Sequence, residues 1–345
     1  MIIREAREIV KQWVREEASQ RPGFLGAFFH GSINWLSDDA PLPTTSDVDV
    51  MIVLSAPAPV EKLGKILYQD LIIEASYLPS DQIRTAEQVL GVSHLAGSLR
   101  GGSIIADPTG HLHAIQAEVS RNYAKRAWVV RRCEHAEGKL RANLQSIAET
   151  VPYHDQVIAW LFGTGVTTHI LLAAGLRNPT VRKRYLAVRD LLVAYGHADF
   201  YEALLDLLGC AWMTRAAVEA HLDPLIAVFN SASSVLRTPF SFAADISEQA
   251  RPVAIDGSRE MIEHGDHREA MFWLAVTYTR CMIVLAQDGT PGLSEQHEPN
   301  WLHLLADLGI RCPTDLKDRS QAVLHALPQI WRAAKAVMDA NPEIQ

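Results

Sequence analysis

The sequence predicts an α+β protein in which a small mixed-sheet domain is followed by an all-helical domain. Over residues 1–110, short apolar runs of strand length alternate with helix patterns and turn signals. From residue 111 onwards, apolar residues recur with the period of an α-helix, and breakers such as Asn178-Pro179 separate the segments. The turn sequence Asp107-Pro108-Thr109-Gly110 divides the two patterns, so we expect domains at 1–110 and 111–345.

The N-terminal domain is expected to contain four strands and three helices. Its clearest strand, 47–54, reads DVDVMIVL and is rich in β-branched residues. The other strands are expected at 24–29, 71–78 and 103–106, and the helices at about 2–19, 59–68 and 81–90. In the second domain, helical periodicity extends over about 113–148, 155–175, 180–195, 198–208, 213–236, 267–286 and 317–338.

Composition and charge limit the classes of function. The chain has 345 residues, four cysteines and a formal net charge of −8. An acidic chain is not typical of a nucleic-acid binder, because phosphate backbones require clustered Lys and Arg. It suits a cationic small molecule, or a small anion held by a local basic patch. The cysteines form no CxxC pair, which indicates reduced thiols in the cytoplasm rather than disulfides or a zinc site.

One stretch raises the question of a membrane. Val157 to Leu176 carries no charged side chain and is long enough to span a bilayer. Glycine, threonine and histidine dilute its apolar character, so we expect a buried core helix instead. The N-terminus also lacks the apolar core of a signal peptide. We therefore expect a cytoplasmic protein with no membrane partner.

Two acidic residues on the clearest strand predict a metal site. Successive strand side chains point to opposite faces, so Asp47 and Asp49 share one face, about 6–7 Å apart along the backbone. Neighbouring carboxylates repel each other, and a divalent cation between them removes that penalty. Oxygen ligands favour a hard ion such as Mg²⁺. The alternative is that Asp-x-Asp is only the solvated face of an edge strand.

The preceding strand ends in a sequence that suits phosphate binding. Gly31 lets a phosphate approach the backbone, and the Ser32 hydroxyl with nearby N–H groups can bind its oxygens. Phosphoryl and nucleotidyl transfer need such donors beside a metal, because their transition states are strongly anionic. Ser46 has two interpretations: it binds phosphate, or it hydrogen-bonds its own backbone.

Glu74 lies in the middle of the expected strand 71–78, between apolar neighbours, and therefore needs a partner. If this strand lies beside the strand of Asp47 and Asp49, Glu74 completes a three-carboxylate cluster. It would then bind a second metal ion or accept the proton of an attacking hydroxyl. The alternative is a salt-bridged strand residue.

These residues resemble a known superfamily. The order Gly-Ser, a loop, Asp-x-Asp on a strand and a later strand carboxylate is similar to that of the DNA polymerase β-like nucleotidyltransferases. FHGSINW and SDVDVMIV look like the antibiotic-resistance branch, which modifies aminoglycosides and lincosamides. The resemblance covers residues 24–78, and the loop between Ser32 and Asp47 is slightly longer than usual. We expect this loop to be a surface insertion.

The resemblance implies a role for each motif residue. Gly31 and Ser32 would bind the triphosphate of ATP or another NTP, and Asp47 and Asp49 would hold two Mg²⁺ ions. Glu74 would match the carboxylate that acts as base in the streptomycin/spectinomycin adenylyltransferases. Residues 1–110 would thus be the nucleotidyltransferase domain, and 111–345 a helical domain that binds the acceptor.

A basic cluster in the helical part is a second candidate for phosphate binding. Cations gather where a helix is expected to begin, and a helix N-terminus is a natural anion site. Lys183 or Arg182 would then hold the triphosphate; the alternative is a solvated helix face. The cluster consists of Arg177, Arg182, Lys183, Arg184 and Arg189.

Three functions are compatible with these patterns. The first is an enzyme that transfers a nucleoside monophosphate, with AMP the first choice, to a hydroxyl of a small molecule such as an aminoglycoside-like antibiotic, releasing pyrophosphate. The second keeps this chemistry with a protein or tRNA acceptor, as in toxin–antitoxin relatives. The third is a nucleotide-binding protein without catalysis, in which Glu74 would lie out of reach of the two aspartates.

Overall fold

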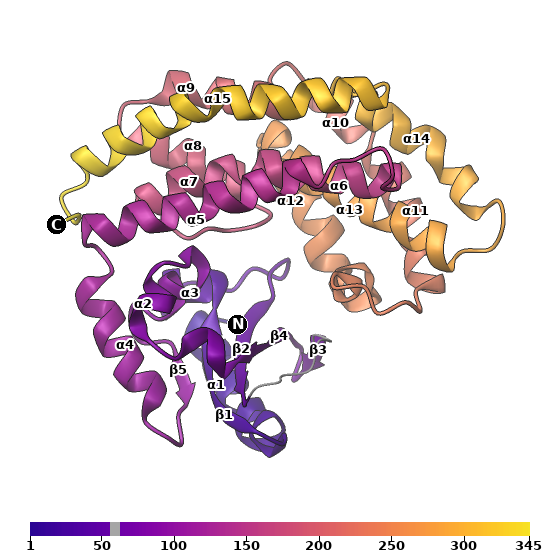
Figure 1. Cartoon of the computed structure of the whole chain (residues 1–345). Coiled ribbons are helices and arrows are strands. Elements are labelled where there is room, and N and C mark those ends of the chain that lie inside the picture. Colours follow the sequence, from indigo (N-terminus) through magenta and orange to yellow (C-terminus); the bar gives the residue numbers. More distant parts are fainter. Residues whose placement is uncertain (56–62) are drawn as a thin grey trace. The chain divides into compact units, whose positions relative to one another are not determined.

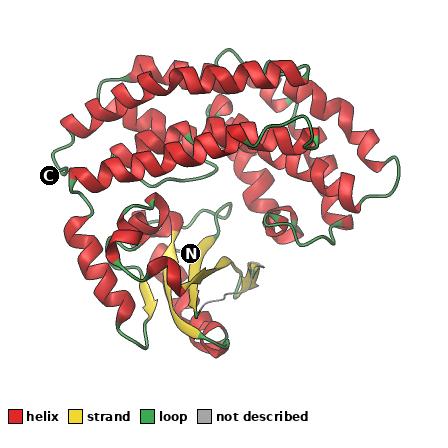
Figure 2. Ribbon diagram, in the orientation of Figure 1, coloured by secondary structure: helices red, strands yellow, loops and turns green. Residues whose placement is uncertain are grey.

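The computed structural model describes residues 1–55 and 63–345, and it is an α+β fold. A mixed sheet lies in the N-terminal part of the chain, and helices make up most of the remainder (Figures 1 and 2). The chain divides into two compact units. Unit 1 comprises Met1–His135, Leu176–Pro179 and Pro342–Gln345, and unit 2 comprises Ala136–Gly175 and Thr180–Asn341. The turn at residues 107–110 therefore lies inside unit 1.

Unit 1 is built on a five-stranded sheet of order β3-β4-β2-β1-β5. β2 and β4 pair in parallel, and the other neighbours are antiparallel. The strands are β1 (Phe24–His30), β2 (Val48–Leu54), β3 (Gly64–Tyr68), β4 (Leu71–Pro79) and β5 (Ile104–Ala106). The helices are α1 (Ile3–Glu16), α2 (Ala86–Leu90), α3 (Ser93–Ser98) and α4 (His111–Asn122).

The two faces of this sheet are buried by different helices. Val48, Val50 and Ile52 alternate along β2 and pack with α1. Met51 and Val53, on the opposite face, pack with residues of α2, α3 and α4. Because the side-chain period is two residues, Asp49 shares the face of Met51 and Val53. The hydrophobic pattern thus fixes the face on which the acidic side chains lie.

The loop between Ser32 and Asp47, which we expect to be a surface insertion, is hydrogen-bonded to the N-terminal helix α1. Backbone hydrogen bonds join Ile3 to Ala40 and Arg4 to Asp38, and Ile2 forms a bridge with Pro41. The loop therefore packs along the start of α1 and enters β2 in a defined direction.

All the secondary structure that is described in unit 2 is helical. α13 is its central helix and packs against α6, α11, α12 and α14. α5 (Arg126–Gln145) begins in unit 1 and continues into unit 2. The others are α6 (Tyr153–Gly165), α7 (Thr167–Ala174), α8 (Arg184–Ala194), α9 (Ala198–Leu208), α10 (Arg215–Glu219), α11 (Leu222–Val235), α12 (Gly257–Glu263), α13 (His267–Asp288), α14 (Leu293–Asp307) and α15 (Pro313–Ala340).

Among the described residues, two stretches are long and apolar enough to cross a membrane. They are Tyr153–Ala174 and His267–Asp288, and 78% and 83% of their apolar windows are buried inside the structure. The first overlaps the charge-free stretch noted in the sequence. Burial of this extent is what core helices show, in agreement with the expectation for residues 157–176.

Several expected elements differ from the structure. The helix expected at 59–68 is wrong over residues 64–68, which form strand β3; residues 59–62 lie outside the described residues. The single helical segment 113–148 is two helices, α4 and α5. α3, α12 and α14 were not expected. α14 begins after the Gly289–Gly292 turn and contains Pro299, which disguises its helical period.

A buried acidic residue joins three helices of unit 2. Glu269 on α13 is 2% exposed and accepts hydrogen bonds from Arg189 on α8 and Tyr201 on α9. The contact distances are 2.9 Å and 2.6 Å. A buried carboxylate of this kind requires its partners, and removing it takes away the acceptor of the Tyr201 hydroxyl and one of the two carboxylates at Arg189 Nη1, which keeps Asp266.

We therefore expect Glu269→Ala to lower the free energy of unfolding by about 3 kcal/mol. Urea denaturation followed by far-UV circular dichroism measures the change. Glu202→Ala is the matched control, because Glu202 pairs with Arg268 through an exposed side chain. Loss of that pair should cost about 1 kcal/mol or less. Equal losses in the two variants would contradict a structural role for the buried network.

Candidate metal centre

Strand pairing brings three carboxylates together at one place on the sheet. Asp49 on β2 lies opposite Glu74 on β4 in the parallel register, and Asp47 immediately precedes β2. One ligand atom from each of the three side chains lies within 4.8 Å of the others. All three residues are partly buried. Asp47, Asp49 and Glu74 therefore form one cluster, as expected if β4 lies beside β2.

The cluster includes a cation that the sequence interpretation missed. Lys65 on β3 lies opposite Glu74 in the antiparallel register, and its side chain is 2% exposed. Its Nζ contacts Glu74 Oε2 at 2.5 Å and also forms an ion pair with Asp47 Oδ2. The prediction of a helix over residues 59–68 placed Lys65 on a helix instead of a strand, so its pairing with Glu74 was missed. Five strand residues are too few for side-chain periodicity to reveal the strand, and the positive φ of Gln69 and Asp70 in the turn that follows is visible only in the structure.

The Lys65 ammonium determines the charge state of its neighbour. Burial acts to raise the pKa of Asp47, but the attraction of Lys65 and the hydrogen bond from it outweigh burial, so the pKa lies below its ordinary value. Asp47 is thus held ionised, which is the form that ligates a metal.

The turn after β1 approaches the acidic cluster closely. His30 pairs with Asp49 across β1 and β2, and Gly31 follows with φ of +64°. A Cβ on Gly31 would lie 2.1 Å from Asp49 Oδ2, so only glycine leaves room for this carboxylate. Ser32 follows in the same short 3-10 turn, Gly31–Trp35. The structure therefore places the Gly-Ser sequence beside the acidic strand.

The same turn is anchored from two sides. Arg7 on α1 donates through Nη2 to the carbonyl of Ile33 at 2.8 Å. Asn34 donates through Nδ2 to the carbonyl of Phe29 at 2.7 Å. These bonds hold backbone groups that the end of β1 leaves outside the sheet ladder. They fix the turn against Asp49 independently of any ligand.

The remaining predicted residues lie in two different settings. Ser46 directly precedes Asp47, and its backbone N–H donates to the Pro43 carbonyl at 3.0 Å. Lys183 belongs to unit 2, at the residue before α8. Burial and the neighbouring Arg182 lower the pKa of Lys183, while Glu260 and Asp266 act in the opposite direction. Lys183 thus lies at the N-terminus of a helix, as expected, and charged side chains of both signs lie near it.

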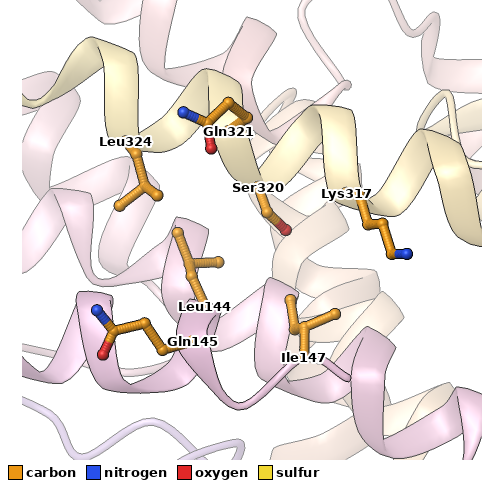
Figure 3. Close-up of a pocket in the computed structure, with 7 residues that line it drawn as sticks. All are labelled: Leu144, Gln145, Ile147, Lys317, Ser320, Gln321 and Leu324. Atoms are coloured by element: carbon orange, nitrogen blue, oxygen red, sulfur yellow. The ribbon is translucent and has the colours of Figure 1, made fainter. Parts of the chain in front are cut away.

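Unit 2 also has a surface pocket of about 210 Å³, between the end of α5 and α15. Figure 3 shows Leu144 and Ile147 pointing towards α15 and Leu324 pointing back towards α5. Lys317 is the one charged residue in its lining, and it pairs with Glu149 at 2.7 Å. A lining of this kind offers no converging acid, base or metal ligand, so the pocket is a weaker candidate than the acidic cluster.

The donor set of the cluster fits a hard divalent cation. All three candidate ligands are carboxylates, and oxygen-only sites suit Mg²⁺, Ca²⁺ or Mn²⁺. Comparisons with models of known protein families and with curated proteins find no match for this chain. The case for the metal centre therefore depends on the residues and their geometry.

The close approach at Gly31 leads to a test. We expect Gly31→Ala to weaken Mn²⁺ binding by about tenfold or more, because the added methyl group must displace Asp49. Mn²⁺ binding is measured by calorimetry or electron paramagnetic resonance.

Gly102→Ala is the matched control, because Gly102 also has φ of +64° but nothing within 4 Å of an added Cβ. Both variants carry the same backbone penalty, and only the first carries the clash. Unchanged Mn²⁺ affinity in Gly31→Ala would refute the role of this glycine.

Proposed function

We propose that this chain is a Mg²⁺-dependent nucleotidyltransferase, which transfers a nucleoside monophosphate from an NTP to a hydroxyl of a small molecule and releases pyrophosphate. One observation carries the proposal: Asp47, Asp49 and Glu74 converge within 4.8 Å on paired strands. The Gly31-Ser32 turn approaches one of these carboxylates, that of Asp49. Acidic ligands beside a backbone turn that admits a phosphate are what nucleotidyl transfer requires.

The proposal assigns a role to each side chain. Asp47 and Asp49 hold the metal, and Mg²⁺ bound there supplies charge neutralisation for the triphosphate. Ser32 and the backbone N–H groups of its turn bind phosphate oxygens. Glu74 accepts the proton of the acceptor hydroxyl, whose oxygen bonds to the α-phosphorus as the bond to pyrophosphate breaks.

The motif order supports placing the chain in the DNA polymerase β-like superfamily. Gly-Ser precedes Asp-x-Asp, and a strand Glu follows. In that superfamily's antibiotic-resistance branch, a helical domain accompanies the catalytic domain, as helices follow the sheet here. The proposal takes ATP as the first choice of nucleotide and an aminoglycoside-like or lincosamide-like antibiotic as the acceptor. The net charge of −8 agrees with a cationic acceptor.

The basic cluster argues against a protein or tRNA acceptor. That alternative needs an exposed basic face, whereas Arg182 and Arg184 are buried within unit 2. Arg182 donates to the Val253 carbonyl at 2.7 Å, and Arg189 pairs with Asp266 and Glu269. A nucleotide-binding protein without catalysis is also disfavoured, because that alternative requires Glu74 to be remote from the aspartates.

A substitution series tests the proposal. We expect Asp49→Asn to lower pyrophosphate release by about a thousandfold, and Glu74→Gln by about a hundredfold or more, because they remove a metal ligand and a proton acceptor. The assay combines labelled ATP, Mg²⁺ and a panel of aminoglycosides and lincosamides. Glu87→Gln, on the exposed surface of α2, is the matched control and should retain activity.

Pyrophosphate release must depend on the acceptor for the proposal to stand. Labelling of tRNA or of a protein, with no small molecule active, would replace the proposed acceptor and keep the chemistry. Nucleotide binding without turnover on any of these acceptors would overturn the enzymatic assignment.

A further inference from the structure

Lys65 occupies an unusual position for a lysine on an edge strand. β3 is at one edge of the sheet, where lysine side chains commonly extend into solvent. Here the side chain is 2% exposed and its ammonium is directed inwards. It bridges Asp47, which precedes the central strand β2, and Glu74, in the middle of β4. The cation is thus part of the acidic cluster.

Burying an ammonium group costs several kcal/mol unless it is paired with opposite charge. The carboxylates of Asp47 and Glu74 both contact Nζ. These ion pairs hold the Lys65 side chain in place, and they also hold the two carboxylates. Without this cation, Asp47, Asp49 and Glu74 would repel one another at close range. The ammonium therefore offsets one of the three carboxylate charges.

The charge count has a consequence for metal stoichiometry. Among the residues that the structure describes, the three carboxylates and the Lys65 ammonium carry a net charge of minus two, which a single divalent ion neutralises. A second ion would add excess positive charge, and it would compete with Nζ for Asp47 and Glu74. The Asp47 carboxylate has two oxygens, so it can contact Lys65 and still ligate one ion together with Asp49.

We propose that Lys65 is the resident cation of this site, so that the Asp47, Asp49 and Glu74 cluster binds one divalent ion where two would otherwise bind. This inference rests on the proposed metal site and departs from the two ions that the superfamily resemblance implies. Lys65 acts through Asp47 and Glu74: it offsets part of their negative charge, while Asp47 and Asp49 ligate the single ion.

Metal counting without nucleotide tests the inference, with Mn²⁺ alone as the probe. The full chain is titrated and followed by electron paramagnetic resonance and calorimetry. We expect one Mn²⁺ per chain for the wild type and for Lys65→Arg, which keeps the positive charge. Lys65→Met should bind the first Mn²⁺ about tenfold or more tightly and gain a second ion, because an opposing charge is gone.

Two controls separate metal effects from misfolding and from loss of any lysine. Lys11→Met removes a lysine that pairs with Glu8 on the exposed surface of α1, and it should leave the titration unchanged. Asp49→Asn should abolish the binding that the other variants modify. Far-UV circular dichroism checks that each variant is folded, and Lys65→Gln, a second neutral variant with the same expected titration, decides the question if Lys65→Met does not fold.

Two equivalent Mn²⁺ ions in the wild type would overturn the inference, as would an unchanged titration in folded Lys65→Met. A wild type that binds no Mn²⁺ would overturn it too. Failure of the proposed function is distinguishable: one Mn²⁺ bound, with the expected response to Lys65→Met but no pyrophosphate release, would refute nucleotidyl transfer and leave the role of Lys65 intact.

Discussion

Mutual repulsion among three carboxylates is the constraint around which unit 1 is organised. The parallel register of β2 and β4 sets Asp49 opposite Glu74, so the two residues stay adjacent as long as the strands remain paired. Apolar residues on the other face, such as Val50 and Ile73, are buried against α1 and hold that register. Hydrophobic burial therefore stabilises an arrangement that electrostatics alone would separate, and Lys65 offsets part of the repulsion.

The turn at Gly31 depends on the same constraint from the other side. β1 pairs with β2 as far as His30, and the chain must then turn away without filling the space of the Asp49 carboxylate. A glycine in the left-handed conformation lets the chain turn and leaves room for the carboxylate. The hydrogen bond from Arg7 to the Ile33 carbonyl holds the turn to α1. The acidic cluster and the adjacent turn are thus one rigid unit, which favours ligand binding with little reorganisation.

The sequence predicted the core of this site because the relevant signals are local. Strand periodicity placed Asp47 and Asp49 on one face, and an isolated Glu74 among apolar residues indicated a partner on a neighbouring strand. Lys65 was missed because its significance comes from pairing between β3 and β4, which side-chain periodicity over five residues does not reveal. The same limit applies to α14, where an internal proline masked the helical pattern.

Charge patterns in the helical part were harder to interpret, because the amino-acid sequence alone does not show whether a cationic side chain is buried or exposed. Arg184 is buried, with its guanidinium 4.0 Å from the Phe272 ring centroid, and Arg189 is paired with Asp266 and Glu269. A cluster that resembles a basic face in the sequence is therefore largely committed to packing within unit 2. Cations used in this way are not available to a polyanionic partner. That physical difference is the ground on which we propose a small hydroxyl-bearing acceptor rather than a nucleic acid.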